Sequence, residues 1–440
     1  MLIGIDASRA NKDHKSGTEW YSYYVIRWLA KIDAKNQYIL YSDTPLKGGL
    51  LDLTTKQHFD ASPAFASFRR PLFGQEMNGA RFDKKGFQIL KSPHDNFKAK
   101  VLKWRFPFCW TQIRFSLEML FSKPDILFIP AHALPIIHPK RSIATIHDIG
   151  FEKERKLYSS DYLGPRAGVF RYIFNLLFRL FTFGRYGATV LDYHSWSSRF
   201  SLKHARRIIT ISHFSKKEIM ETYKPKRDKI KVIYNGYNKF LYKKIDQAEE
   251  IKKVLEKHDI KGPYIFYVGR LEKKKNTPAL IEAYAIAKED HKEIKHKLVL
   301  AGDASHGYDE VKYMIREFDL ENDVIITGWV PEADMPYIYN GASAFIFPSL
   351  YEGFGIPLLQ AMACGTPIAA SRAGSIPEIA GKAAILFDPN NVKSMAEAIS
   401  GIILDDGLRQ SLIKKGLDRV KDFSWEKCAR ETLAEIEELK

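Results

Sequence analysis

The segment PSLYEGFGIPLLQAMACGTP, residues 348–367, combines a carboxylate, a glycine-rich turn and the start of a helix. It follows an apolar run of the kind that forms a buried strand. Gly353 and Gly355 let the backbone come close to a ligand, and Pro357 suits the first turn of a helix. Free N–H groups at a helix start attract phosphate, so we expect the backbone of Gly353, Phe354 and Gly355 to form an anion site.

Glu352 stands at the carboxyl end of the expected strand, where parallel α/β sheets place their ligands. A carboxylate beside a phosphate site is electrostatically unfavourable unless it accepts hydrogen bonds from neutral hydroxyl groups. A sugar supplies such hydroxyls. We therefore predict that Glu352 binds a sugar, against the alternative that it is an exposed loop residue.

A second group of candidate residues lies in YVGRLEKKKN, residues 267–276. Arg270 follows an expected strand and Lys275 lies at the start of the next helix. The guanidinium fork and the ammonium can together neutralise a diphosphate leaving group. No Asp-X-Asp pair follows a strand here, so we predict that no metal or other cofactor is needed. Lys273 and Lys274 are interpreted as solvated members of a basic loop.

Two histidines follow apolar runs in the N-terminal half. His147 comes after IATI and precedes Asp148, which places it at a strand end beside a candidate orienting carboxylate. A structural histidine paired with its neighbour is the alternative. His132 has a similar position in IPAHALP, but we assign it no catalytic role.

The glycine of SGTEW marks another candidate contact. Gly17 and Thr18 precede apolar positions with helical spacing, so a helix start lies here. The helix start would point into the cleft between the domains, and the alternative is that Gly17 only makes a turn.

The elements that must position these residues alternate short apolar runs with helical patterns, which is typical of parallel strands joined by crossover helices. We predict two doubly wound, Rossmann-like α/β domains. The runs of the first are LIGID, YILYS, DILFIP, RSIATIHD, RRIITIS and IKVIYNG. Those of the second are YIFYVG, KLVLAG, VIITGWV, ASAFIF, PIAAS and AAILF.

The best linker candidate lies between the two series of runs. It is rich in lysine and glutamate and ends in Gly262 and Pro263. We therefore assign residues 1–245 to the first domain and residues 246–424 to the second. Within the first domain, two segments do not fit a minimal Rossmann layout; they are residues 52–118 and 151–200.

One of these segments contains GVFRYIFNLLFRLFTF, residues 168–183. On a helix, Arg171, Asn175 and Arg179 form one polar stripe among large apolar residues. The stretch is too short and too charged to span a bilayer. It is either an interfacial amphipathic helix or a helix packed against its own domain.

Charge is distributed unevenly along the 440 residues. Residues 1–240 hold 41 Lys and Arg against 20 Asp and Glu, and residues 241–440 hold 27 against 32, so the halves carry +21 and −5. The first half either faces something anionic, such as a membrane surface, a phosphorylated acceptor or nucleic acid, or simply has a solvated basic surface.

The cysteines and the first residues indicate the compartment. There are only 3 Cys, without CxxC spacing, which argues against a disulfide framework and a cysteine zinc site. The opening MLIGIDAS has no basic region and no long apolar region, so it is interpreted as a first strand rather than a signal peptide. We expect a cytoplasmic location.

Taken together, the motifs resemble the family 4 retaining glycosyltransferases of GT-B fold, a group that includes bacterial mannosyl- and glucosyltransferases. The resemblance covers nearly the whole chain except the two irregular segments. The matching pieces are SGTEW, TIHD, TISHFSK, VIYNG, VGRLEKKKN, AGD, ITGWVPEADMPYIY, the 348–367 block and FSWEKCA.

The resemblance implies roles for particular residues. It implies that Arg270 and Lys275 bind the donor diphosphate, that Glu352 binds the donor sugar, and that His147 lies near that sugar in the cleft between the domains. These four form the predicted catalytic set. Gln360 stands where the family has a glutamate that contacts the ribose. A glutamine can still accept and donate there, so donor binding is expected to survive.

The remaining implied contacts concern the base and the domain arrangement. Gly328, Trp329 and Val330 match the family's wall for the nucleotide base, and Gly17 and Thr18 match its loop near the donor phosphates or acceptor. The donor is expected in the C-terminal domain and the acceptor in the N-terminal domain. A final helix at residues 425–440 is expected to cross back to the first domain.

The predicted function is retaining transfer of a hexose, of mannose or glucose type, from a nucleotide diphosphate sugar to a glycan or lipid-linked acceptor in cell-surface polysaccharide synthesis. The enzyme is expected in the cytoplasm, with peripheral contact to an anionic inner membrane face left open. One alternative is a catalytically degenerate nucleotide-binding protein, suggested by Gln360. An epimerase or phosphorylase fits the motifs less well. A protein that only binds an anionic surface or nucleic acid is a less favoured alternative, and no nucleic-acid partner is expected, since no recognition module is present.

Overall fold

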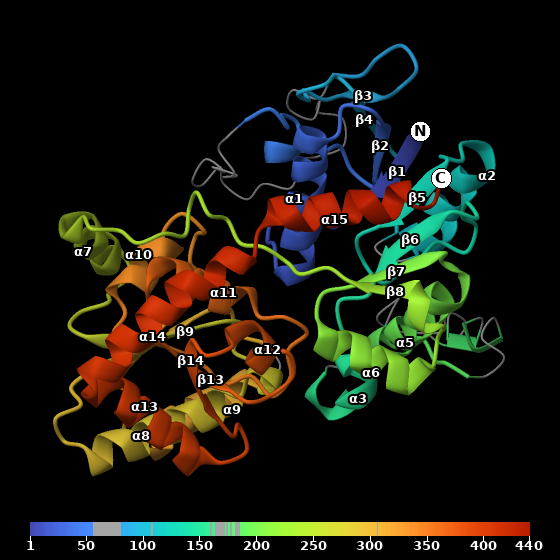
Figure 1. Ribbon diagram of the computed structural model, residues 1–440. Coiled ribbons are helices and arrows are strands. Elements are labelled where there is room, and N and C mark those ends of the chain that lie inside the picture. Colours follow the sequence, from blue (N-terminus) through green and yellow to red (C-terminus); the bar gives the residue numbers. More distant parts are fainter. Residues whose placement is uncertain are drawn as a thin grey trace.

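A computed structural model describes residues 1–55, 81–106, 109–158, 161–162, 172, 175–176, 178–180, 185–305 and 307–440. Within these residues the chain forms two α/β halves, each built on its own sheet (Figure 1). The strands of the first sheet are β1 (Leu2–Asp6), β2 (Gln37–Ser42), β3 (Gln88–Ile89), β4 (Phe97–Val101), β5 (Ile126–Ile129), β6 (Ser142–Thr145), β7 (Arg207–Thr210) and β8 (Ile230–Val232). Those of the second are β9 (Tyr264–Val268), β10 (Lys297–Ala301), β11 (Val324–Gly328), β12 (Ala344–Phe347), β13 (Ile368–Ser371) and β14 (Ala384–Phe387).

The strand orders are those of doubly wound sheets. The first sheet has the order β3-β4-β2-β1-β5-β6-β7-β8, in which only the β3–β4 pair is antiparallel, and the second has the order β11-β10-β9-β12-β13-β14. The order reverses beside β1 and beside β9. Ligands of such sheets bind beyond the carboxyl ends of the strands at these reversals. The predicted pair of Rossmann-like domains is confirmed.

Helices cover both sheets. In the first half they are α1 (Gly17–Ile32), α2 (Ser116–Phe121), α3 (Gly150–Lys153), α5 (Val190–His204) and α6 (His213–Tyr223), with a π-helical segment η2 (Trp110–Phe115) and 3-10 turns η1 (Gly48–Leu50), η3 (Arg155–Leu157) and η4 (Arg227–Lys229). In the second they are α7 (Ala248–Lys257), α8 (Thr277–Asp290), α9 (Tyr308–Glu317), α10 (Met335–Gly341), α11 (Ile356–Cys364), α12 (Ile376–Ala380), α13 (Val392–Leu404), α14 (Asp406–Arg419) and α15 (Trp425–Glu437), with 3-10 turns η5 (Lys273–Lys275) and η6 (Val420–Asp422).

Apolar residues bury the central strands on both faces, as the continuous runs predicted. Every residue of β5, β6 and β12 is buried. Because both faces are covered, the polar ends of these strands are where side chains can reach a ligand. Among the described residues, no helix combines the length and the apolar character needed to cross a bilayer.

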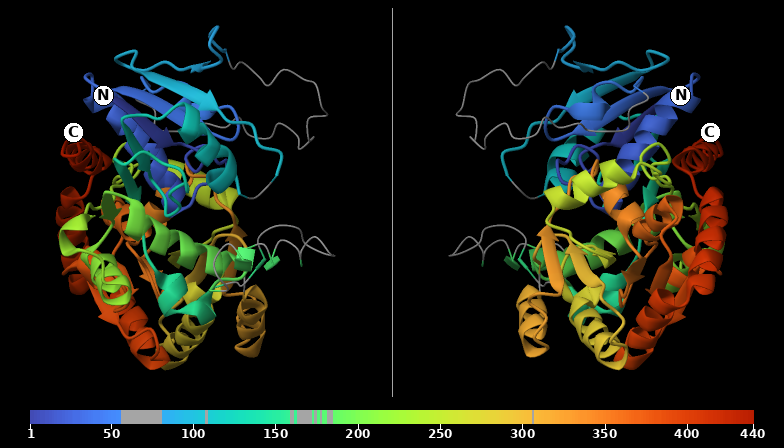
Figure 2. Two further views of the ribbon diagram at one scale, coloured as in Figure 1. Left: turned by 90° about the vertical axis from the view of Figure 1, so that its right-hand side faces the viewer. Right: turned by 90° about the vertical axis from the view of Figure 1, so that its left-hand side faces the viewer.

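The last helix returns to the first half of the chain. α15 lies against α1, and the N- and C-termini are close together in space (Figures 1 and 2). The Trp425 ring is 2% exposed and stacks on Tyr24 of α1 with centroids 5.2 Å apart. The boundary at residue 245 falls between β8 and α7, and the exact domain limits stay a prediction.

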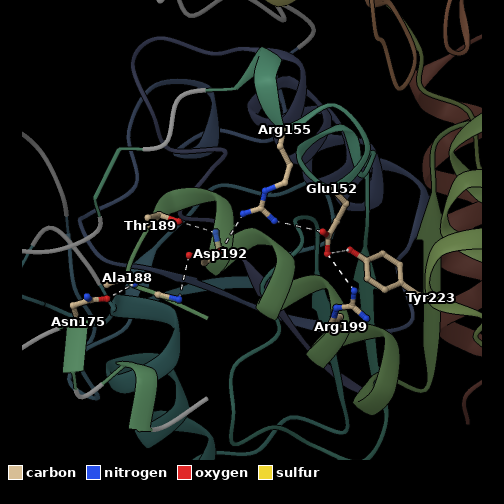
Figure 3. A network of polar contacts seen from close by, with 9 residues as sticks. Glu152, Arg155, Asn175, Ala188, Thr189, Asp192, Arg199 and Tyr223 are labelled. Carbon is tan, nitrogen blue, oxygen red and sulfur yellow. Dashed lines mark hydrogen bonds and ion pairs between the residues drawn. The ribbon is translucent and has the colours of Figure 1, made fainter. Parts of the chain in front are cut away.

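The predicted helix at 168–183 lies mostly outside the described residues, and so does Arg171. Of the predicted polar stripe, Asn175 accepts a hydrogen bond from the Ala188 N–H at 3.0 Å (Figure 3). The described apolar residues of the segment include Tyr172, Leu176 and Leu180, which are 72%, 47% and 65% exposed. Asn175 therefore faces the protein, while these three side chains face solvent.

A polar network joins α3, η3, α5 and α6 beside this segment (Figure 3). Glu152 accepts a hydrogen bond from the Tyr223 hydroxyl at 3.0 Å and pairs with Arg199 at 3.5 Å. Arg155 pairs with Asp192 at 3.1 Å. Since α3 directly follows the His147–Asp148 turn, the network fixes the chain just beyond a candidate site residue.

We expect Trp425→Ala to lower the free energy of unfolding by about 3–5 kcal/mol, because it removes a buried ring from the α1–α15 contact. Tyr313→Ala is the control, since this ring on α9 is 59% exposed, and its effect should stay within about 0.5 kcal/mol. Urea unfolding followed by far-ultraviolet circular dichroism measures both. Equal stability of the two variants would show that the α1–α15 contact does not stabilise the fold.

Candidate active site

The Glu352 loop connects β12 to α11. Gly355 has φ 94°, a left-handed conformation that suits glycine, and it immediately precedes the first residue of α11. Glu352 is 9% exposed, and its carboxylate pairs with the Lys275 ammonium. Its carbonyl accepts hydrogen bonds from the N–H and the hydroxyl of Ser375, both at 3.0 Å. The carboxylate is thus held at the start of a helix, beside a cation.

The charge state of Glu352 follows from these neighbours. Burial is the largest influence and raises the pKa of the carboxyl, but the positive charges of Lys275 and Lys274 and hydrogen bonding to the carboxylate together outweigh it, so the pKa lies below its ordinary value. The ionised carboxylate can accept hydrogen bonds from hydroxyl groups. Glu352 therefore has the protonation state that the predicted sugar binding requires.

The structure corrects the interpretation of Lys274. Lys273 is exposed, as predicted, but Lys274 is half-buried. Its ammonium lies over the rings of Tyr158 and Tyr351, 4.8 Å and 5.7 Å from their centroids. Tyr158 comes from the first half of the chain, so Lys274 makes a cation–π contact between the halves. The sequence could not distinguish Lys274 from the lysines on either side of it, because only the fold determines which side chain lies over the two rings.

Arg270 lies beyond the end of β9 and is exposed. Its guanidinium forms no ion pair with the described residues. Lys275 ends η5, directly before α8. Both cations therefore lie beyond the carboxyl end of β9. Lys275 is paired with Glu352, whereas Arg270 is available to bind an anion.

His147 is buried at the carboxyl end of β6, with 5% of its surface exposed. Its Nε2 hydrogen-bonds the Pro130 carbonyl at 3.0 Å. Burial lowers the pKa of His147 below its ordinary value, against smaller opposing effects of that carbonyl and of Asp148. The neutral ring must donate from Nε2 to a carbonyl, which leaves Nδ1 as an acceptor.

The orienting partner of His147 differs from the one expected. The Asp148 carboxylate accepts a hydrogen bond from the Gly150 N–H at 3.0 Å and so closes its own turn. Pro130, at the end of the neighbouring strand β5, holds the ring instead. This partner could not be found from local sequence because it lies 17 residues away. His132 also lies here, with its ring centroid 5.7 Å from that of His147.

The two halves of the site meet at Gly353. A Cβ placed on this glycine would lie 2.8 Å from the Asp148 Cβ and 3.0 Å from the His147 carbonyl oxygen. The donor-side loop therefore touches the His147–Asp148 turn with no room for a side chain. Residues more than 200 positions apart become neighbours through this one contact.

Glu378 of α12 ties the halves together beside this contact. Its carboxylate accepts hydrogen bonds from the N–H groups of His213 and Phe214 at 2.8 and 2.9 Å, and from the Tyr234 hydroxyl at 2.8 Å. The two N–H groups open α6, so the carboxylate caps a helix of the other half. Sequence reasoning missed Glu378, because a capping acid on a distant helix has no local signal.

The start of α1 carries a hydrogen-bonded cap at Ser16 and Glu19, next to the predicted contacts Gly17 and Thr18. Gly17 opens the helix, and Thr18 follows it. The Ser16 N–H donates to Glu19 at 3.2 Å, and Arg9 pairs with the same carboxylate at 3.3 Å. This is a capping box closed by an ion pair. A donor phosphate contact of Gly17 and Thr18 stays a prediction.

Two further predicted donor residues have partners within the protein. The Phe354 ring is buried against Tyr234 and Phe423, with centroids 6.1 and 5.9 Å away. Only its backbone N–H therefore stays a candidate for the donor. The Gln360 carbonyl accepts a hydrogen bond from the Tyr339 hydroxyl at 3.2 Å, which leaves its amide group as a donor.

The predicted base wall follows β11. Gly328 has φ 67°, Val330 is buried, and the Trp329 ring is 50% exposed. Trp329 meets the edge of the His14 ring at 5.3 Å, across the two halves. An exposed ring between the halves is suited to stacking on a base. Among the described residues, no group of three metal-ligating side chains is arranged to hold an ion, and metal independence stays a prediction.

Comparison with known families gives two matches along the chain. The family described as "Glycosyl transferases group 1" matches residues 231–419, and "Glycosyltransferase Family 4" matches residues 80–239. The chain belongs to the family 4 glycosyltransferases. The resemblance of its motifs to this family is confirmed.

Curated relatives of this glycosyltransferase include two O-antigen enzymes. The O-antigen chain mannosyltransferase B of Escherichia coli is 32% identical over 234 residues, which is 53% of this chain and 61% of the relative. The O-antigen chain mannosyltransferase RfbU of Salmonella typhimurium is 24% identical over 329 residues, covering 73% of this chain and 78% of the relative. The match with the first therefore spans less than two thirds of its length.

Solved structures match along nearly the whole glycosyltransferase. The sucrose-phosphate synthase of Thermosynechococcus elongatus has a TM-score of 0.66 at 17% identity and covers 99% of this chain and 98% of its own. The Anabaena HepE protein, crystallised with UDP and glucose, has a TM-score of 0.63 at 17% identity, with 98% of each chain covered. The predicted GT-B fold is confirmed.

We expect Gly353→Ala to lower kcat of the glycosyltransferase about 10- to 100-fold, because the added methyl group forces the two loops apart. Gly401→Ala, on α13, is the matched control, since a Cβ there would also meet nothing within 4 Å. Steady-state kinetics with the nucleotide sugar measures both. Full activity of Gly353→Ala would show that the contact with the His147–Asp148 turn is unimportant.

We also expect Glu378→Ala to lower the free energy of unfolding by about 1–3 kcal/mol and to reduce kcat, because α6 loses its cap on the other half. The control is Glu397→Ala, an exposed glutamate on α13. Urea unfolding and kinetics are measured together. A stability loss without any change in kcat would limit Glu378 to a structural role.

Proposed function

We propose that this chain is a retaining mannosyltransferase that moves the hexose of a nucleotide diphosphate sugar to a glycan or lipid-linked acceptor. The observation that carries the proposal is the Gly353 contact. It brings the buried Glu352–Lys275 pair at the start of α11 against the turn that bears His147. A carboxylate and an ammonium at the end of one sheet thereby lie beside the turn that bears a histidine at the end of the other, which supports a site for a sugar and its diphosphate.

The donor is assigned to the second half of the chain and the acceptor to the first. The diphosphate would lie between Arg270, Lys275 and the backbone N–H groups of Gly353, Phe354 and Gly355. Lys275 would then share its charge between the phosphate and Glu352. The carboxylate, freed from a full ion pair, would turn to the sugar hydroxyls. Trp329 would pack on the base, and Gln360 would donate to the ribose through its amide.

Charge stabilisation supplies most of the catalysis in this scheme. As the bond from the anomeric carbon to the diphosphate breaks, negative charge grows on the leaving phosphate. Arg270 and Lys275 stabilise that charge, together with the helix start. The acceptor hydroxyl attacks on the same face, and its proton passes to the departing phosphate oxygen. The neutral His147 positions the sugar as a hydrogen-bond acceptor through Nδ1.

The choice of mannose is supported by two relatives whose names describe O-antigen chain mannosyltransferases. HepE, which was crystallised with UDP and glucose, supports a nucleotide sugar as the donor class. We assign the reaction to cell-surface polysaccharide synthesis on the same ground. The enzyme is proposed to work in the cytoplasm, in peripheral contact with the anionic inner face of the membrane.

The first experiment is a thermal-shift panel of UDP, GDP, ADP and their sugar conjugates, with EDTA and then with magnesium. A rise in Tm with one diphosphate in EDTA identifies the base and supports metal independence. Turnover of the matching mannose and glucose donors then decides the sugar. A Tm rise without turnover of any donor would favour the catalytically degenerate alternative.

We expect Glu352→Ala, Arg270→Ala and Lys275→Ala each to lower kcat at least about 100-fold, because each removes a charged group from the donor site. Lys273→Ala is the matched control. It removes the same charge two residues from Lys275, but from an exposed side chain, and we expect nearly normal kcat. Equal losses in Lys273→Ala and Lys275→Ala would reject a specific phosphate contact.

A further inference from the structure

The helical segment formed by η2 and α2 has its apolar side facing solvent. Ile113, Leu117, Leu120 and Phe121 are 46%, 44%, 49% and 86% exposed. Their spacing of four, three and one places them on one face of a helix. We name these four residues the α2 face. A surface helix normally turns such a stripe toward the core, so its exposure is unusual.

The opposite side of the same helix is buried and contains its acidic group. Phe115, Ser116, Glu118 and Met119 are the buried residues. Glu118 pairs with Lys100 at 2.5 Å and with Arg114 at 3.3 Å. The carboxylate is therefore turned inward and neutralised. The helix is fixed in this orientation by an ion-pair network, so the outward apolar stripe is part of the fold.

Basic side chains flank the α2 face. Lys103 and Arg105 precede η2, Lys123 follows α2, and all three are exposed. None of them forms an ion pair with the residues that the structure describes. The nearby Asp125 accepts a hydrogen bond from the Leu2 N–H at 2.7 Å. Together with the +21 charge of residues 1–240, these residues make the chain on either side of the face basic.

The α2 face lies on an outer edge of the molecule. Figure 1 shows α2 on the side of the first half that faces away from the second half. The second half therefore does not cover it. The η2 segment also contacts the loop that follows β5. There the Gln112 side-chain amide donates a hydrogen bond to the Leu134 carbonyl at 3.2 Å. The helix that bears the face thus contacts the loop that begins with Pro130, the hydrogen-bond partner of His147.

We infer that the α2 face docks on an anionic lipid surface. The four apolar side chains enter the boundary between headgroups and acyl chains, and Lys103, Arg105 and Lys123 contact lipid phosphates. A second copy of the chain fits less well, since symmetric pairing of this face would bring the same three cations together. The inference rests on the peripheral location proposed above and names the surface that produces it.

The test is sedimentation with vesicles of phosphatidylcholine, with and without phosphatidylglycerol, at low and high salt. The intact protein should bind the anionic vesicles, and more weakly at high salt. The variant Leu117→Ser/Leu120→Ser/Phe121→Ser should bind them at least about tenfold less, because it removes most of the inserted surface. The variant Lys103→Glu/Arg105→Glu/Lys123→Glu should lose the preference for anionic lipid.

The control is Tyr313→Ser/Leu404→Ser, which removes two exposed apolar residues, 59% and 42% exposed, from the second half. It should bind as the intact protein does. The Tm shift given by the nucleotide diphosphate is measured on every variant, and an unchanged shift separates lipid docking from donor binding and from misfolding.

Three results would overturn the inference. The apolar variant binding as well as the intact protein would place the lipid contact elsewhere. An intact protein that binds no vesicle at low salt would reject the peripheral location itself, while leaving the transferase proposal intact. A dimer in solution that the apolar variant converts to a monomer, without vesicle binding, would assign the face to a second copy of the chain.

Discussion

Close contact between two backbones is the constraint on which this site depends. Gly353 carries no side chain, so the loop after β12 can rest on the His147–Asp148 turn of the other half. Two Rossmann-like sheets each present their strand ends, but neither alone brings the buried carboxylate of Glu352 to the turn that carries His147. The Glu378 cap on α6 and the return of α15 to α1 hold the halves where this contact forms.

The buried ion pair of Glu352 and Lys275 determines the charge state of the candidate site. Glu352 stays ionised in a nearly closed environment because Lys275 and Lys274 offset the cost of desolvation. In the proposed function, this pair meets a ligand that carries both a diphosphate and hydroxyl groups. Such a ligand can replace each half of the ion pair with a partner of its own. The η2–α2 segment shows the opposite arrangement, with the Glu118 carboxylate neutralised inside and the apolar α2 face outside.

Much of the fold could be predicted because buried parallel strands have a strong local signature. The continuous apolar sequence of β12 predicts a buried strand, and the glycines after it predict the tight turn into α11. The role of Lys274 could not be predicted, since three adjacent lysines are equivalent until the fold places Tyr158 over one of them. The same holds for Pro130 as the partner of His147, and for Glu378, whose partners lie more than 100 positions away.

The sequence by itself determined the two-sheet architecture, the family and the candidates Arg270, Lys275, Glu352 and His147, because strand periodicity, glycine turns and charged loop residues act over a few neighbouring positions. The tertiary structure decided which of these meet, which cation pairs with the carboxylate, and which side of α2 faces water. Those outcomes depend on distances between segments far apart in the chain, and local propensity carries no information about such distances.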